Sequence, residues 1–106
     1  MSEVVRQIMS ELKERLAALY GDRLRCVYLF GSYARGEADA ESDLDVPIVL
    51  DRVDSYASEI SRTGGVISEL SLRSGISLSR VFTAEARWRE DSTLFFLNLR
   101  EEAIPV

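Results

Sequence analysis

The sequence predicts an α/β fold of the α+β kind, in which a small mixed sheet of three or more strands is flanked by helices. Three observations support this class. Apolar residues recur at helical spacing in two long segments, nearly continuous apolar runs of strand length lie between other segments, and the two patterns alternate along the chain. With 106 residues and 46% hydrophobic content, we expect a single domain over residues 1–106.

The N-terminal segment, residues 3–20, is predicted to form an amphipathic helix. Ser2 can cap its first turn, and Gly21 can end it. The predicted apolar face consists of Val5, Ile8, Leu12, Leu16 and Leu19.

Two strands are predicted next, at residues 24–30 and 43–50. The first is almost entirely apolar, which suits a strand covered on both faces. Residues 33–42 between them are long enough for one helical turn and a loop. Pro47 lacks an N–H group, so it predicts an edge, a bulge or an early end of the second strand.

A second long helix is predicted at residues 54–74, with Asp54 as its cap. Gly64 and Gly65 lie inside it and each lowers helix stability by about 1 kcal/mol relative to alanine, so we expect a kink or a break there. A phosphate-binding loop at this pair is disfavoured, because no lysine follows and no strand precedes it.

The C-terminal third begins with a predicted strand at residues 76–83, whose register shifts at Val81 and Phe82. Thr83 is expected to cap a short helix that ends at Trp88. A last helix is predicted at residues 92–101, and the four residues after 102 form an edge strand or lie on the surface.

Composition excludes several classes of function. The net charge of -5 argues against a direct nucleic-acid binder, and the absence of histidine excludes Ser-His triads and histidine-ligated zinc. The single cysteine, Cys26, is expected to be a buried thiol in a reducing compartment. No apolar run reaches the roughly 20 residues of a membrane span, and no signal peptide is recognised. We therefore expect a cytoplasmic protein that does not bind membranes.

The most informative residues are two acids, Asp43 and Asp45, at the start of the second strand. Alternate residues of a strand share a face, so their carboxylates are expected to point the same way and to repel each other. A divalent cation such as Mg²⁺ would relieve that repulsion, because hard cations take oxygen ligands. Gly31 and Ser32 end the preceding strand, and a turn of this kind can offer N–H groups and a hydroxyl to phosphate oxygens.

These motifs resemble the signature of the polymerase-β-type nucleotidyltransferase superfamily. The run Phe-Gly-Ser-Tyr-Ala-Arg-Gly-Glu at residues 30–37 and the run Ser-Asp-Leu-Asp at residues 42–45 are similar to the pattern of the minimal nucleotidyltransferases (MNT). Those are short proteins that are often the antitoxin partners of HEPN-domain toxins. The resemblance covers about residues 24–83 and implies a palm-like nucleotidyltransferase fold.

The resemblance also implies roles for individual residues. Gly31 and Ser32 would hold the β- and γ-phosphates of a nucleoside triphosphate, with Arg35 either touching phosphate or pairing with a nearby acid such as Glu37. Asp43 and Asp45 would be the catalytic residues and the ligands of Mg²⁺. The implied reaction transfers a nucleoside monophosphate, expected to be AMP from ATP, to an acceptor hydroxyl.

One departure from the family pattern concerns a third carboxylate, which active members usually carry on the next core strand. Residues 75–84 contain no aspartate or glutamate, and Ser77 or Ser79 stands in its place. Glu69 or Glu85 could substitute from elsewhere, although their spacing does not indicate it. Losing a general base typically lowers a rate by about 10²–10⁴-fold.

Two hypotheses about function follow. In the first, the chain is an Mg²⁺-dependent nucleotidyltransferase that modifies a hydroxyl, by family analogy a tyrosine of a HEPN-type toxin. In the second, it is a catalytically weakened nucleotide-binding module that neutralises its partner by binding alone. Neither the nucleotide base nor the oligomeric state is specified, and a homo-oligomer stays open.

Four aromatic residues have two interpretations each. Trp88, Phe95 and Phe96 are more simply core residues, but a small domain has few places to bury three aromatic rings, so a partner-binding patch is the alternative. Tyr33, beside the predicted phosphate site, either stacks on a base or is a solvated loop residue.

Overall fold

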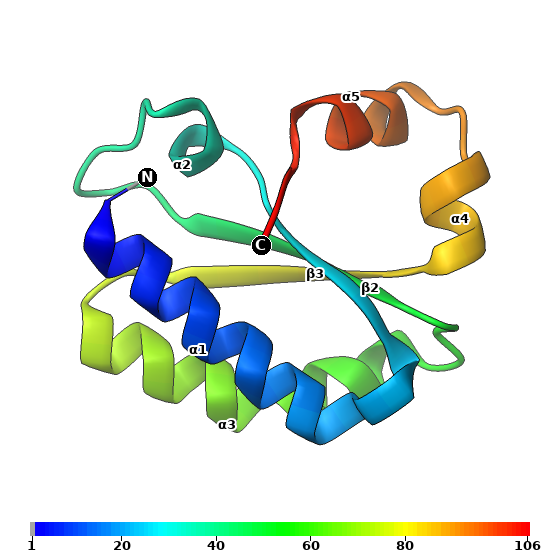
Figure 1. The fold of residues 1–106 in the computed structure, drawn as a ribbon, viewed down its shortest axis with the longest axis horizontal. Helices are drawn as coiled ribbons and strands as arrows, with labels where there is room; N and C mark the ends of the chain where they lie inside the picture. Colours follow the sequence, from blue (N-terminus) through cyan, green and yellow to red (C-terminus); the bar gives the residue numbers. More distant parts are fainter. Residues whose placement is uncertain (1) are drawn as a thin grey trace.

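The computed structural model describes residues 2–106 (Figure 1). The elements follow one another as α1 (Glu3–Tyr20), the 3-10 turn η1 (Gly21–Arg23), β1 (Leu24–Leu29), α2 (Ser32–Arg35), β2 (Leu44–Leu50), α3 (Tyr56–Ser74), β3 (Leu78–Ala84), α4 (Glu85–Glu90), α5 (Leu94–Glu102) and β4 (Ile104–Pro105). Within this described range, no helix combines the length and the apolarity that a membrane crossing requires.

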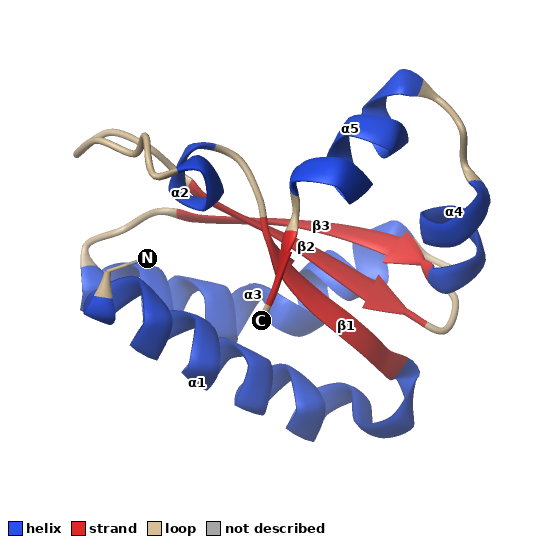
Figure 2. Ribbon diagram, turned by 45° about the horizontal axis from the view of Figure 1, so that its top comes forward, coloured by secondary structure: helices blue, strands red, loops and turns tan. Residues whose placement is uncertain are grey.

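The four strands form one mixed sheet in the order β3-β2-β1-β4. β2 and β3 run parallel, whereas β1 runs antiparallel to both of its neighbours, β2 and β4. Helices α1 and α3 cover one face of the sheet, and α2, α4 and α5 lie on the opposite side (Figure 2). The predicted fold class is therefore confirmed, and the C-terminal tail contributes the short edge strand β4.

The main core lies between the sheet and the pair α1 and α3. The predicted cap of α1 is present, because the Ser2 hydroxyl accepts a hydrogen bond from the Val5 N–H at 3.2 Å, and Gly21 ends the helix. Alternate residues of β2 point into this core, as the pattern predicted. The largest fully buried side chains of the cluster are Met9, Leu12, Leu16, Leu29, Leu44, Ile48, Leu50 and Leu70.

The opposite face of the sheet has a smaller apolar cover. Tyr28 of β1 stacks on Trp88 of α4 with ring centroids 4.5 Å apart. Val49, Phe96 and Leu99 are also buried outside the main core cluster. The core interpretation of Trp88 and Phe96 therefore holds, since one is stacked and the other is buried.

Pro47 is not at an edge, because β2 is a central strand. The N–H of Leu44 donates to Ser77 O next to β3, whereas Asp45 O accepts from Phe30 beyond β1, so successive residues face opposite neighbours. The nitrogen of Pro47 consequently faces β1. The β1–β2 ladder has a gap at this position, between Ile48 and the isolated bridge at Asp45, as expected where a strand residue has no N–H to donate.

Two expectations about α3 are wrong. Its cap is Ser55, whose hydroxyl accepts from the Ser58 N–H at 3.3 Å, while Asp54 pairs with Arg52 instead. The helix also continues without a break through Gly64 and Gly65. Packing of the buried face against the core outweighs the low helix propensity of the two glycines.

The strand β3 begins at Leu78, two residues later than expected, and has no register shift. It pairs with β2 residue by residue from Leu78 to Ala84. Arg80 takes the inward position between Leu78 and Phe82, where its guanidinium donates to Thr63 Oγ1 and Ile60 O, both at 2.7 Å. Because the half-buried Arg80 takes an inward position where an apolar residue was expected, the sequence pattern suggested a shift of register.

The predicted cap of the following helix is also wrong. Thr83 remains in β3 and is buried, and α4 starts at Glu85 with Ala84 in the cap position. The last helix was predicted over residues 92–101, and α5 covers Leu94–Glu102.

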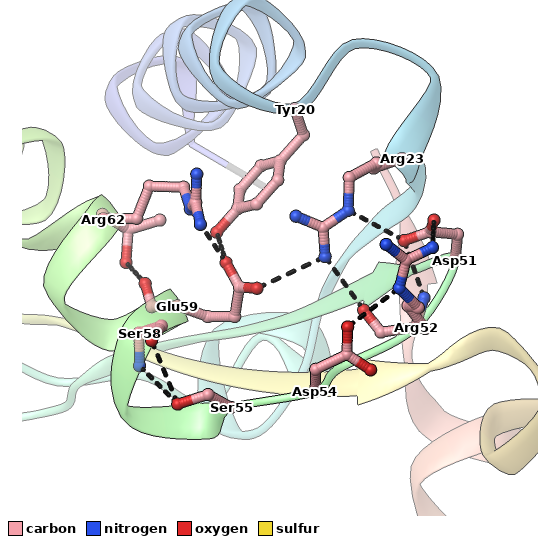
Figure 3. Close-up of polar contacts among 10 residues, drawn as sticks. Tyr20, Arg23, Asp51, Arg52, Asp54, Ser55, Ser58, Glu59 and Arg62 are labelled. Atoms are coloured by element: carbon pink, nitrogen blue, oxygen red, sulfur yellow. Dashed lines mark hydrogen bonds and ion pairs between the residues drawn. The ribbon is translucent and has the colours of Figure 1, made fainter.

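A buried carboxylate, that of Glu59, joins the end of α1 to the start of α3 (Figure 3). It accepts hydrogen bonds from Tyr20 Oη at 2.7 Å, from Arg62 Nε at 3.1 Å and from an Arg23 guanidinium nitrogen at 3.3 Å. Arg23 in turn binds Asp51 at the end of β2. A buried carboxylate with this many donors is satisfied, and the cluster fixes how the two long helices meet.

The substitution Glu59→Gln is expected to lower the free energy of unfolding by about 2–3 kcal/mol, because it leaves buried donors facing an uncharged amide. Urea denaturation measures this. The exposed Glu14→Gln of α1 serves as the control and should change stability by less than about 0.5 kcal/mol.

The stability difference between wild type and Glu59→Gln should also depend on pH. Burial alone raises the pKa of Glu59, but the hydrogen bonds from Tyr20 and Arg23 and the charges of Arg23 and Arg62 together lower it below its ordinary value of 4.5. A lowered folded-state pKa stabilises the fold above the unfolded value, and this contribution is lost as the pH falls through the folded value. The difference should be full at neutral pH and shrink below pH 4.5; a constant difference down to pH 3 would contradict this account.

Candidate active site

One backbone hydrogen bond fastens the end of β1 to the start of β2. Phe30 N–H donates to the carbonyl oxygen of Asp45 at 2.9 Å. The next residue, Gly31, has a φ of 82° and opens the single turn α2 at Ser32. A side chain rarely allows this backbone conformation, so the corner depends on glycine. The structure thus brings Gly31 and Ser32 next to Asp45.

The contact between Gly31 and Asp45 is very close. A Cβ atom added to Gly31 would lie 2.5 Å from Asp45 Oδ2, which is shorter than any normal contact. Gly31 is buried, and the Asp45 carboxylate rests directly on its Cα. The absence of a side chain at residue 31 therefore sets the position of this carboxylate.

The two acids differ in their surroundings. Asp43 lies one residue before β2 and is exposed, whereas Asp45 is half-buried. Burial raises the pKa of Asp45, the charge of Asp43 raises it further, and the charge of Arg35 opposes both. The carboxylates are therefore close enough to repel, and a cation between them would reverse that repulsion.

The loop before Asp43 is shaped by Asp39 and Ser42, and the sequence interpretation had given neither residue this role. Asp39 Oδ1 accepts hydrogen bonds from the Glu41 N–H at 2.9 Å and from the Ser42 hydroxyl at 3.2 Å. The Ser42 hydroxyl also accepts from the Asp39 N–H at 3.0 Å. An aspartate three residues before a serine is typical of such turns, so this signal was available.

The two remaining side chains of the Gly-Ser turn have other contacts. Arg35 forms an ion pair with Glu37 at 3.1 Å, which is the alternative to phosphate binding that the sequence left open. Both side chains are exposed, so this pair contributes little stability and does not prevent Arg35 from turning to a ligand. Tyr33 is half-buried in α2 and packs against the main core, so it is not a solvated loop residue.

Of the two serines considered for the place of the third carboxylate, Ser79 is the one beside Asp45. It is the in-register partner of Asp45 on the parallel strand β3, and in-register neighbours share a face of the sheet. Ser77 precedes the strand. Glu69 and Glu85 do not substitute, because Glu69 lies in α3 on the other face of the sheet and Glu85 follows Ala84, at the opposite end of β3 from Ser79.

The donor set fits a hard divalent cation held by two ligands. Asp43 and Asp45 offer carboxylate oxygens beside a corner without a side chain, which is the chemistry that Mg²⁺ prefers. In residues 2–106, no group of three or more acidic or cysteine side chains is arranged to hold a metal ion. A cation here would complete its coordination with water and phosphate oxygens, as Mg²⁺ commonly does.

A pocket of about 210 Å³ adjoins Asp45 on the face of the sheet opposite the main core. Its lining residues come from four parts of the chain: Phe30, Asp45, Val46, Pro47, Val81, Phe95 and Leu99. Strand alternation predicts that Asp45 and Pro47 share a face, but the arrival of α5 over that face is a long-range contact that no local pattern shows.

The substitution Gly31→Ala is expected to lower the free energy of unfolding by at least about 2 kcal/mol, because it combines a strained backbone with a clash against Asp45. The matched control is Gly64→Ala in α3, where an added Cβ meets nothing within 4 Å. That change should instead raise stability by about 0.5–1 kcal/mol. Equal effects of the two substitutions in thermal unfolding would refute the close contact.

Comparison with known proteins identifies the family. A model described as "Nucleotidyltransferase domain" matches residues 9–93. A protein of Methanocaldococcus jannaschii, provisionally named a protein adenylyltransferase, is 36% identical over 75 residues, which are 71% of this chain and 75% of that protein.

Two solved structures share the fold. One, described provisionally as a minimal nucleotidyltransferase, has a TM-score of 0.69 at 23% identity and covers 98% of this chain and 94% of its own. The other, a toxin-antitoxin crystallised with AMP-PNP, has a TM-score of 0.62 at 18% identity and covers 90% of this chain and 69% of its own. At these identities the structures bear on the fold alone. The family match over residues 9–93, together with the Methanocaldococcus relative, shows that the chain belongs to the nucleotidyltransferase domain family and is a nucleotidyltransferase.

Proposed function

We propose that this nucleotidyltransferase transfers AMP from ATP to a hydroxyl group of a protein, with Mg²⁺ bound by Asp43 and Asp45. The observation that carries the proposal is the placement of the Asp45 carboxylate directly against the Gly31 corner. ATP as the donor agrees with the cytoplasmic location expected from the sequence.

Each site residue has a distinct task in this proposal. Gly31 lets the triphosphate approach the backbone closely, and the Ser32 hydroxyl donates to a phosphate oxygen. Asp43 and Asp45 hold the cation, and Arg35 exchanges Glu37 for phosphate when the nucleotide arrives. Bound Mg²⁺ would screen the charge of the triphosphate and stabilise the leaving pyrophosphate.

The proposed chemical step is an in-line displacement at the α-phosphorus. The acceptor oxygen forms a bond to this phosphorus, the bond to the β-phosphate oxygen breaks, and pyrophosphate leaves with the electron pair. The acceptor proton passes to water, because Ser79 is not a base near neutral pH. A phenol suits this situation better than an aliphatic hydroxyl, since a tyrosine ionises with a pKa near 10.

The acceptor is proposed to be a tyrosine of a HEPN-type toxin, for which the chain would act as the antitoxin. Three things support this: the provisional name of the Methanocaldococcus relative, the toxin-antitoxin with the same fold, and the resemblance in residues 30–45. The acidity of tyrosine compensates for the missing third carboxylate.

A second candidate is a module that neutralises its partner by binding, without transfer. The specific observation that favours it is Ser79, which stands beside Asp45 where active members carry an acid. Transfer of the nucleotide to the partner and neutralisation of the partner therefore need separate measurements.

The variants Asp43→Asn and Asp45→Asn should each lower transfer of label from [α-³²P]ATP to the partner by at least about 100-fold, because each removes a metal ligand. The exposed Glu41→Gln, in the loop before the site, is the control and should label normally. If both variants still neutralise the toxin and wild type transfers no label, the binding module is correct and the enzyme is not.

The variant Ser79→Asp should raise the transfer rate by about 10²-fold or more if the rest of the site is intact, because it restores a carboxylate next to Asp45. Ser79→Asn has the same shape without the charge and should not accelerate transfer. A rate that is unchanged by Ser79→Asp would show that the missing acid does not limit the reaction.

A further inference from the structure

The first turn of the helix α5, Leu94–Leu97, is apolar on every side, although only one side of the helix is covered. Phe96 and Leu99 are buried against the sheet, with 4% and 3% of their surface exposed. On its outer side, Leu94 is 73% exposed, Phe95 is 55% exposed and Leu97 is 47% exposed. A helical segment that is apolar all round is normally buried, so the first turn of α5 has an unpartnered face. We call Leu94, Phe95 and Leu97 the α5 patch.

The α5 patch differs from the other exposed apolar residues of the described chain. Val4, Leu19 and Leu72 are exposed on α1 and α3, but they are spread along long amphipathic helices. Single exposed apolar residues are ordinary on a protein surface, whereas a contiguous group marks a contact site. Three such residues within four positions of one short helix form a contiguous group.

The patch is joined to the candidate active site through the pocket beside Asp45. Phe95 lines this pocket from α5 while more than half of its surface faces outward. Pro47 and Val81, which are register partners on β2 and β3, form its floor, and Val81 is 39% exposed. A cavity of about 150 Å³ can hold benzene, so a pocket of about 210 Å³ has room for one aromatic side chain.

A partner at this side of the molecule would not bind by adding a strand to β3, the nearby edge of the sheet. The outward N–H groups of Leu78 and Phe82 are already occupied, because they donate to Ser71 Oγ at 3.1 Å and to Tyr56 Oη at 3.3 Å. Strand addition depends on free edge groups of this kind. Side-chain contact with an apolar surface is the mode that remains.

We propose that the α5 patch docks the acceptor protein through an apolar segment beside its hydroxyl-bearing side chain, which enters the pocket and reaches the reacting groups at Asp45. This inference rests on the proposed function and adds the surface that selects the acceptor. The occupant is argued from continuity: the pocket that borders the patch ends at a carboxylate of the site, so a chain docked on α5 is held within reach of the nucleotide. In Figure 2, α5 lies on the same side of the sheet as α2, the helix that Gly31 precedes.

A second copy of this chain is the alternative occupant. An isologous contact through α5 would place each copy over the pocket of the other and would close both sites to an acceptor. The acceptor is therefore favoured over self-association. Any dimer that wild type shows in sedimentation velocity at micromolar concentration should persist when Leu94 and Leu97 are replaced by glutamine.

The test uses two fluorescein-labelled peptides of about 12 residues. They share one central tyrosine, which is flanked by leucine and phenylalanine in the first peptide and by serine and glutamine in the second. The patch variant is the double substitution Leu94→Gln with Leu97→Gln. The matched control is Val4→Gln with Leu72→Gln, which removes two exposed apolar residues from α1 and α3, the helices on the other side of the sheet from α5.

Binding is measured by fluorescence anisotropy, with no nucleotide present. Wild type and the control variant should bind the apolar peptide at least about tenfold more tightly than the polar peptide, and the patch variant should lose this preference to within about threefold. Equal binding of both peptides by wild type, a preference that survives in the patch variant, or a dimer that dissociates only in the patch variant would each overturn the proposal.

Failure of the proposed function is detected separately. N-acetyl-tyrosinamide is too small to need the patch, so wild type and the patch variant should both transfer label to it from ATP. Absence of that transfer would refute the proposed function, while the anisotropy measurement would still decide whether the α5 patch binds an apolar segment.

Discussion

The contact between Gly31 and Asp45 is the constraint on which the rest of the site depends. The backbone bond from Phe30 to Asp45 holds the end of β1 against the start of β2, and the glycine corner then leaves no side chain between the backbone and the carboxylate. Any residue larger than glycine would push Asp45 away. The same contact half-buries Asp45, and together with Asp43 this burial raises its pKa. The cation that we propose for this site would relieve the repulsion between the two carboxylates.

The two faces of the sheet differ: one packs on the main core, and the other carries the candidate site. One face packs on α1 and α3 and contains nearly all of the fully buried side chains, with the Glu59 cluster fixing the junction of the two helices. The other face has a thinner cover, in which α4 and α5 bury only a few residues against β1 and β2. Because Asp45 points to this thinner side, the site is open to partners, and the exposed surface of α5 lies next to it. Stability is thus supplied from the face that function does not use.

The sequence predicted those features that depend on local chemistry. The cap at Ser2, the glycine corner at residue 31 and the helix and strand order all follow from short-range patterns, and the structure agrees with them. Where two residues competed for one role, local reasoning failed: Asp54 and Ser55 are both good caps, and the structure uses Ser55, while Asp54 pairs with Arg52. Packing of its buried face keeps α3 continuous through Gly64 and Gly65. Pro47 sits in a central strand, at a gap in the ladder between β2 and β1. The pocket beside Asp45 could not be predicted, since it needs α5 to fold back over β2.

The most direct measurement of the central claim is calorimetric titration of a non-hydrolysable ATP analogue into the protein, with and without Mg²⁺. The account predicts saturable binding of one nucleotide per chain that requires both Mg²⁺ and the Asp45 carboxylate, so that it disappears when the metal is chelated and in Asp45→Asn. Binding that is indifferent to Mg²⁺ and to Asp45, or no binding at all, would contradict it.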